Sequence, residues 1–240
     1  ATFESYWNSP DFEVYDEEQK ERLEKALKSE KYFEDNPDQQ YTFDITPYPY
    51  QQEILDKIKA EREVRNNYKN LVVAATGTGK TVISAFDYKN FCKKLGRPAN
   101  LLFVAHREEI LKQAAISFKN VRNSDDIGFL YGNQKDTKNK FIFSLVQTLG
   151  KDEYLNENYF SKDYFDYIVV DEFHHAVSNN YKKIMEYFKP KFLLGLTATP
   201  ERLDSKDVFA LCDYNMVYEV RLKEAIEKGW LVPFRYYGIY

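Results

Sequence analysis

The chain has 240 residues, and its hydrophobic fraction of 43% and charged fraction of 30% are typical of a globular protein. The composition excludes disordered, collagen-like and coiled-coil proteins, and the length fits one large domain with an appendage. The formal net charge is −4, so any contact with nucleic acid must depend on a local track of residues rather than on a globally basic surface.

Cysteine content and hydropathy limit the class of protein further. The chain has only Cys92 and Cys212, far apart and in no cluster with histidine, which excludes a disulfide scaffold and a zinc ribbon. No apolar run approaches the roughly 18 residues that a membrane span needs, and the N-terminus lacks the pattern of a signal peptide. We therefore expect a cytoplasmic protein without a membrane partner.

The first 45 residues are acidic and aromatic and are predicted to form a short helical extension. Residues 16–31 are rich in good helix formers and place Leu23 and Leu27 on one face. A polar loop follows, and prolines then precede a second predicted helix that runs from Gln51 to about Val64.

From residue 70 onward, short apolar runs alternate with helical stretches. The predicted strands are 71–75, 101–105, 141–146, 167–170, 192–196 and 216–220. The predicted helices are 80–94, 108–118, 180–188 and 222–228. Continuous apolar strands that alternate with helices are typical of an α/β fold, in which a parallel sheet is covered by helices on both faces.

Residues 74–81, Ala-Ala-Thr-Gly-Thr-Gly-Lys-Thr, fit a phosphate-binding loop between the first core strand and its helix. The glycines let the backbone curl so that successive N–H groups point at one phosphate, and the helix start adds its positive end. The Lys80 amine can reach the β- and γ-phosphates, and the Thr81 hydroxyl can bind Mg²⁺. A chance glycine-rich turn is the alternative, but the position between an apolar strand and a helix argues against it. The predicted phosphate-binding residues are Thr76, Gly77, Thr78, Gly79, Lys80 and Thr81.

Two adjacent carboxylates, Asp171 and Glu172, follow the apolar strand 167–170. Such a pair is costly at the end of a strand unless a cation is present. Asp171 can then hold Mg²⁺ through water, while Glu172 can orient and deprotonate the water that attacks the γ-phosphate. The alternative is a solvated turn that caps a helix. The phosphate loop upstream favours the catalytic interpretation.

Five segments carry a resemblance to a known family. AATGTGKT, VAHREEI, SLVQTL, DEFHH and LTATP, in this order, resemble the motifs of the first motor domain of superfamily 2 helicases. The DExH branch, which contains restriction-enzyme motor subunits, is the nearest likeness, and the resemblance covers about residues 46–225. It implies a P-loop NTPase fold of the RecA-like type, ATP and Mg²⁺ as cofactors, and nucleic acid as partner, with DNA favoured over RNA.

The resemblance also assigns roles to single residues. Lys80, Asp171 and Glu172 match the catalytic residues, and Thr81 and Asp171 match the metal-binding residues. Gln51 matches the glutamine that reads adenine, because its amide can both donate to and accept from the base. A solvent-facing glutamine at a helix start is the alternative for Gln51.

Two further sets of residues come from the resemblance. The residues that couple the nucleotide state to the rest of the motor are His174, Thr197 and Thr199. The residues that contact the nucleic-acid backbone are His106, Arg107, Gln147 and Thr148. Ordinary turn chemistry and a solvated helix start remain alternatives for these threonines and for Arg107.

The expected organisation is an extension at 1–45, a motor domain at 46–228 and an exit segment at 229–240. Motors of this kind have a second RecA-like domain whose arginines complete the ATP site. No such segment occurs here, so we expect a fragment that binds ATP but hydrolyses it slowly. Two alternative hypotheses are an ATPase unrelated to nucleic acid and a nucleotide-gated interaction module without turnover. The second alternative would not need Glu172.

Overall fold

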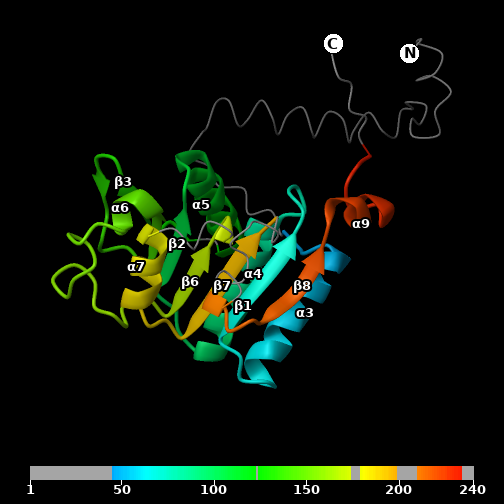
Figure 1. Cartoon of the computed structure of the whole chain (residues 1–240), viewed down its shortest axis with the longest axis horizontal. Coiled ribbons are helices and arrows are strands. Elements are labelled where there is room, and N and C mark those ends of the chain that lie inside the picture. The colour runs from blue at the N-terminus through cyan, green and yellow to red at the C-terminus, as the bar shows by residue number, and fades with distance from the viewer. Residues whose placement is uncertain (1–44, 123, 174–178, 199–209, 234–240) are drawn as a thin grey trace, which may run out of the picture. The chain divides into compact units, whose positions relative to one another are not determined.

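The computed structural model describes residues 45–122, 124–173, 179–198 and 210–233 (Figure 1). The predicted helix at 16–31 and the rest of the extension up to residue 44 lie outside the described residues. Within the described ranges, no helix is long and apolar enough to cross a membrane.

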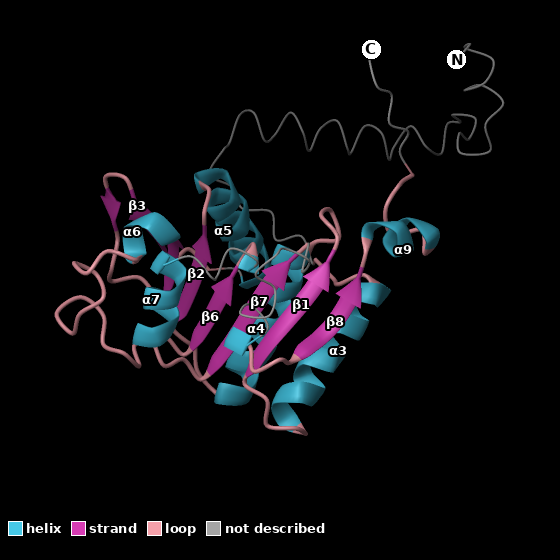
Figure 2. Cartoon of the chain, viewed as in Figure 1, coloured by secondary structure: helices cyan, strands magenta, loops and turns pink. Residues whose placement is uncertain are grey.

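The described residues form one sheet of eight strands in the order β4-β3-β5-β2-β6-β7-β1-β8 (Figure 2). The strands are β1 (Lys69–Ala74), β2 (Leu101–Ala105), β3 (Ile127–Tyr131), β4 (Gln134–Lys135), β5 (Phe141–Leu145), β6 (Tyr167–Val170), β7 (Phe192–Thr197) and β8 (Met216–Val220). All neighbouring strands are parallel except β3 and β4. The carboxyl ends of the parallel strands therefore meet at one edge of the sheet.

Helices cover both faces of this sheet, as the α/β prediction requires. They are α3 (Pro49–Glu63), α4 (Lys80–Leu95), α5 (Glu108–Arg122), α6 (Val146–Leu149), α7 (Asn179–Tyr187) and α9 (Leu222–Glu227). In β1, Val72 and Ala74 belong to the core shared with α3, α4 and α5, whereas Leu71 and Val73 belong to the core shared with α6 and α7. Both layers exclude water, which explains why the strands read as continuous apolar runs. The predicted fold is confirmed.

The structure departs from the sequence prediction at the β3 edge. Strands β3 and β4 and helix α6 were not predicted, and the strand expected at 141–146 ends at Leu145, because Val146 begins α6. In β3, Ile127 and Phe129 are only half-buried, whereas the other three residues are buried. Strand β4 consists of two polar residues that pair with β3 in the antiparallel direction. The edge strand β4 lacks an apolar run, whereas β3 is the apolar run Ile-Gly-Phe-Leu-Tyr, which the sequence analysis missed.

A buried ion pair joins the two helices on one face of the sheet. The Arg62 guanidinium of α3 donates to both carboxylate oxygens of Asp87 in α4, over 2.9 and 3.0 Å. The Tyr167 hydroxyl of β6 donates to the same carboxylate over 2.6 Å. Arg62 is 4% exposed and Asp87 is fully buried, so the pair is shielded from water. Three elements are thus tied at one point.

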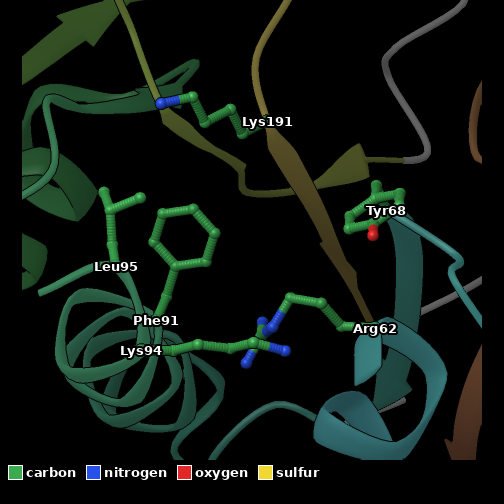
Figure 3. Close-up of a pocket in the computed structure, with 6 residues that line it drawn as sticks. All are labelled: Arg62, Tyr68, Phe91, Lys94, Leu95 and Lys191. Carbon is green, nitrogen blue, oxygen red and sulfur yellow. The ribbon is translucent and has the colours of Figure 1, made fainter. Parts of the chain in front are cut away.

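A cavity of about 440 Å³ lies next to this ion pair, at the amino ends of β1 and β7 (Figure 3). Its lining residues are Arg62, Tyr68, Phe91, Lys94, Leu95 and Lys191. Each of its three cations already has a carboxylate partner: Arg62 pairs with Asp87, Lys94 with Glu63 and Lys191 with Asp166. Arg62 and Lys94 also lie in the last turns of their helices, where cations offset the helix dipole. The charges around this cavity are therefore explained by the packing of the fold.

Replacing Asp87 with Asn keeps the shape of the side chain but removes the charge opposite Arg62. We expect the free energy of unfolding to fall by about 3–5 kcal/mol, because a buried guanidinium is left without a counter-charge. Urea unfolding followed by circular dichroism measures the change. The double variant Arg62→Met, Asp87→Asn buries no charge at this point and should lose less. An Asp87→Asn variant as stable as the unmodified chain would contradict this account.

Candidate nucleotide-binding site

The loop between β1 and α4 adopts the tight turn that its glycines predict. Gly77 and Gly79 have φ values of 91° and 76°, in the left-handed region where only glycine is unstrained. Gly79 is also the N-cap residue of α4, so the backbone N–H groups of the first turn of α4 lie next to the loop. A nucleotide phosphate placed there would meet the positive end of the helix.

Lys80 lies over this loop. Its Nζ donates to the carbonyl oxygen of Ala74 over 2.9 Å and to that of Ala75 over 3.4 Å. Burial lowers the pKa of Lys80, and the negative charges of Asp171 and Glu172 act in the opposite direction. The amine therefore lies within the electric field of both predicted catalytic carboxylates.

The threonines of the loop differ in what they present. Thr76 is exposed, and Thr81 is half-buried in the first turn of α4. Thr78 is fully buried, and its hydroxyl donates to the carbonyl oxygen of Ala75 over 2.7 Å. The Thr78 side chain thus shapes the loop, whereas Thr76 and Thr81 are not fully buried.

Gln51 joins helix α3 to the phosphate-binding loop. Its Nε2 donates to the carbonyl oxygen of Thr78 over 3.1 Å, and its Oε1 accepts from the backbone N–H of Tyr48 over 3.0 Å. The side chain is buried, so the alternative of a solvent-facing glutamine is wrong. The Tyr50 hydroxyl donates to the same Thr78 carbonyl over 3.1 Å. The sequence analysis missed Tyr50, although its position next to Gln51 was a signal.

Three aromatic rings stack beside the loop. Tyr48 and Tyr50 lie with ring centroids 5.9 Å apart, and Trp230 stacks on Tyr50 at 4.5 Å with an interplanar angle of 17°. Cavities of about 550 and 590 Å³ border Tyr48 and Tyr50, Trp230 lines the second of them, and Gly77 lines both. Volumes of this size suit small ligands. Trp230 belongs to the segment predicted only as an exit, so its packing here was also missed.

Asp171 and Glu172 follow β6 at the same edge of the sheet. The Asp171 amide donates to the Val104 carbonyl of β2, and the Glu172 amide donates to Oδ1 of Asp171, each over 2.9 Å. Glu172 has a φ of 51°, an uncommon and strained conformation for a residue with a side chain.

The surroundings of Asp171 disfavour its charge on balance, so the pKa of its carboxyl is raised. Burial raises the pKa of the Asp171 carboxyl; the Glu172 amide lowers it, and the Glu172 charge raises it. The positive charge of Lys80 also lowers it. A cation next to Asp171 would therefore stabilise the ionised form.

The donor set at this edge fits a magnesium–nucleotide complex. Asp171 and Thr81 offer one carboxylate and one hydroxyl, and the described residues contain no cluster of three or more metal-ligating side chains. Mg²⁺ commonly binds proteins through one or two such groups together with water and substrate phosphates. The described residues therefore do not provide a site of the zinc type, in which protein side chains supply most of the ligands.

The segments predicted to contact nucleic acid lie side by side after two neighbouring strands, β2 and β5. The Gln147 amide donates to the carbonyl oxygen of His106 over 3.3 Å. Arg107 and Gln147 are exposed, whereas His106 and Thr148 are half-buried.

The predicted coupling residues are only partly described. Thr197 ends β7, is fully buried and pairs with Val73 of the loop-bearing strand β1. His174 and Thr199 lie outside the described residues.

The fold and the phosphate-binding loop together define a RecA-like P-loop domain. The sequence matches the family described as "Type III restriction enzyme, res subunit" over residues 44–202, and the chain belongs to this family. It is the first RecA-like domain of a superfamily 2 helicase motor related to restriction-enzyme subunits, as the motif series predicts.

Individual relatives agree with this assignment. A candidate ATP-dependent RNA helicase of Acanthamoeba polyphaga mimivirus is 30% identical over 168 residues, which are 70% of this chain and 30% of that protein. The EcoAI type I restriction endonuclease subunit of Escherichia coli is 31% identical over 207 residues, covering 79% of this chain and 24% of that protein. The Hef helicase domain of Pyrococcus furiosus superposes with a TM-score of 0.58 at 25% identity, over 72% of this chain and 37% of that chain. The chain thus spans about a quarter to a third of the length of these curated relatives.

The close packing of Gly79 on Gln51 makes a prediction with an internal control. A Cβ at Gly79 would lie 2.6 Å from Gln51 Nε2, whereas a Cβ at Gly96 would meet nothing within 4 Å, and both residues have φ above 70°. Gly96→Ala should therefore lower the free energy of unfolding by about 1–2 kcal/mol, from backbone strain alone. Gly79→Ala should lower it further, because the Gln51 contact is displaced. Thermal unfolding of both variants measures the difference, and equal losses would refute the contact.

Proposed function

We propose that this chain binds ATP with Mg²⁺ and hydrolyses the γ-phosphate bond as the first half of a DNA-dependent motor. The observation that carries the proposal is the meeting of three features at one sheet edge. These features are a glycine loop at a helix N-terminus, the Lys80 amine above that loop, and the Asp171–Glu172 pair within the electric field of that amine. Phosphoryl transfer needs this combination of cradle, cation and carboxylates.

Each residue then has a chemical task. The loop amides and the Lys80 amine would hold the β- and γ-phosphates, and Thr81 and Asp171 would hold Mg²⁺, which neutralises charge on the phosphates. Glu172 would orient a water molecule and accept its proton at the side-chain carboxylate as the water attacks the γ-phosphorus. The proposed coupling residues His174, Thr197 and Thr199 would sense the loss of the γ-phosphate.

Gln51 is proposed to read the adenine base. Its amide now bridges Tyr48 and the phosphate loop, and it borders a cavity of about 550 Å³. An adenine ring there could exchange hydrogen bonds with the Gln51 amide, and the rings of Tyr48 and Tyr50, which line this cavity, offer it flat apolar surfaces.

DNA is the nucleic acid that we propose for the parent protein. The family description names restriction enzymes, which act on DNA, while one relative is described as a candidate RNA helicase. The segments at His106–Arg107 and Gln147–Thr148 would contact the backbone of the strand, which carries no sequence information.

The complete motor is proposed to include a second RecA-like domain. We propose residues 46–228 as the first motor domain, 1–45 as an extension and 229–240 as the segment toward the second. An arginine from a facing domain is worth about 10³–10⁵ in the rate of phosphoryl transfer. Steady hydrolysis would then require both domains, and ATP binding without turnover in the complete motor would favour a nucleotide-gated interaction module instead.

The Lys80→Ala variant tests the nucleotide site. We expect ATP binding in the presence of Mg²⁺ to weaken at least about tenfold, or about 1.4 kcal/mol, because the amine above the loop is lost. Isothermal titration calorimetry measures the affinity. The control is Lys112→Ala, which removes an exposed lysine paired with Glu108 on α5 and should leave the affinity unchanged. Equal affinities of Lys80→Ala and the unmodified chain would remove the basis of the proposal.

Nucleic-acid binding is expected to be weak, independent of sequence and only shallowly dependent on salt. A log–log salt slope of about 1–3 in magnitude corresponds to a few neutralised phosphates, and Arg107→Ala should reduce it by about 0.7 on a single strand. Fluorescence anisotropy with DNA and RNA strands of the same sequence measures both slope and preference. Arg65→Ala, at an exposed arginine after α3, is the control. Tighter binding to RNA would overturn the DNA assignment, and an unchanged slope would overturn the role of Arg107.

A further inference from the structure

Tyr181 of α7 carries a buried hydroxyl that the fold itself does not use. The residue is 1% exposed, and its hydroxyl oxygen has no hydrogen-bond partner among the described residues. Burying a hydroxyl without a partner costs free energy, so folded proteins seldom keep one without a reason. A phenylalanine would fill the same space without this cost.

The surroundings of Tyr181 connect it to the proposed magnesium site. Its ring belongs to the same buried cluster as Val170 and Phe173, the residues on either side of the Asp171–Glu172 pair. Burial raises the pKa of Tyr181 far above its usual value, and the charges of Asp171 and then Glu172 raise it further. The hydroxyl therefore keeps its proton, and the negative charges of both carboxylates act on it.

Asp171 is the group that would benefit from such a donor. It is 7% exposed, and the Glu172 amide donates to only one of its two oxygens, Oδ1. Carboxylates that bind a metal ion are usually held by an outer hydrogen bond, and losing that bond typically costs 10–100-fold in metal affinity or activity. Catalytic hydrogen bonds are also often long in free enzymes and shorten when the ligand binds.

We propose that Tyr181 is a positioning residue whose hydroxyl donates a hydrogen bond to the Asp171 carboxylate when the magnesium nucleotide binds. The bond holds the carboxylate oriented toward the metal ion. This inference rests on the proposed function, because it takes Asp171 as the magnesium residue. It also gives α7 a direct part in nucleotide binding, although α7 lies outside the five recognised motifs.

The variant Tyr181→Phe removes only the hydroxyl, and Tyr187→Phe on the same helix is its matched control. The Tyr187 hydroxyl already donates to the Phe160 carbonyl over 2.7 Å. ATP affinity of the 240-residue chain is measured by calorimetry across a Mg²⁺ series and in EDTA. Tyr181→Phe should raise the Mg²⁺ concentration at half-saturation about 10–100-fold and leave metal-free ATP binding unchanged. Tyr187→Phe should change neither quantity.

Thermal unfolding of the same proteins separates positioning from folding. Tyr181→Phe should be at least as stable as the unmodified chain, because it deletes an unpartnered buried hydroxyl, whereas Tyr187→Phe should be less stable. Equal Mg²⁺ series for Tyr181→Phe and the unmodified chain would overturn the role of Tyr181 alone. Absence of any Mg²⁺-dependent ATP binding in the unmodified chain would overturn the proposed function instead.

Discussion

The buried contact of Arg62, Asp87 and Tyr167 is the constraint on which the site depends. It joins the last turn of helix α3, the middle of helix α4 and the first residue of strand β6. The same three elements carry Gln51 near the start of α3, Lys80 at the start of α4 and Asp171 just after β6. Because helices and buried strands are stiff, fixing one point of each limits where these residues lie. A paired buried charge also disfavours other packings, since any alternative would leave it unmatched.

The amino ends of the strands hold structural ion pairs, whereas the carboxyl ends hold the candidate site. At the amino ends, the cations meet carboxylates and fill structural roles around a cavity that the fold itself explains. At the carboxyl ends, backbone donors, a lysine and two carboxylates face a common region, and strands β2 and β5 bring the segments of His106 and Gln147 into contact. Open α/β sheets commonly place ligands at this edge, because the loops there converge from several strands.

The sequence predicted the central strands and the chemical groups at their ends, because both leave a local signal. Strands β2 and β6 are uninterrupted apolar runs, and β1, β5 and β7 each contain three consecutive apolar residues or more. The loop glycines are required by the turn itself. What it could not predict depends on partners distant in the chain. Strand β4 exists through backbone pairing, Trp230 matters only because it stacks on Tyr50, and Tyr181 resembles any core tyrosine until its unpartnered hydroxyl is seen.

The left-handed backbone at Glu172 has a consequence for how this protein can be altered. A glycine or asparagine would adopt a φ of 51° with less strain than glutamate does. The residues that are least strained at this position therefore cannot serve as the proposed base. Selection for thermal stability alone would favour such replacements, and these would remove the proposed catalytic carboxylate. At this position, thermal stability and the proposed turnover therefore place opposite demands on the side chain. Stabilising substitutions in this domain should be made at positions other than 172.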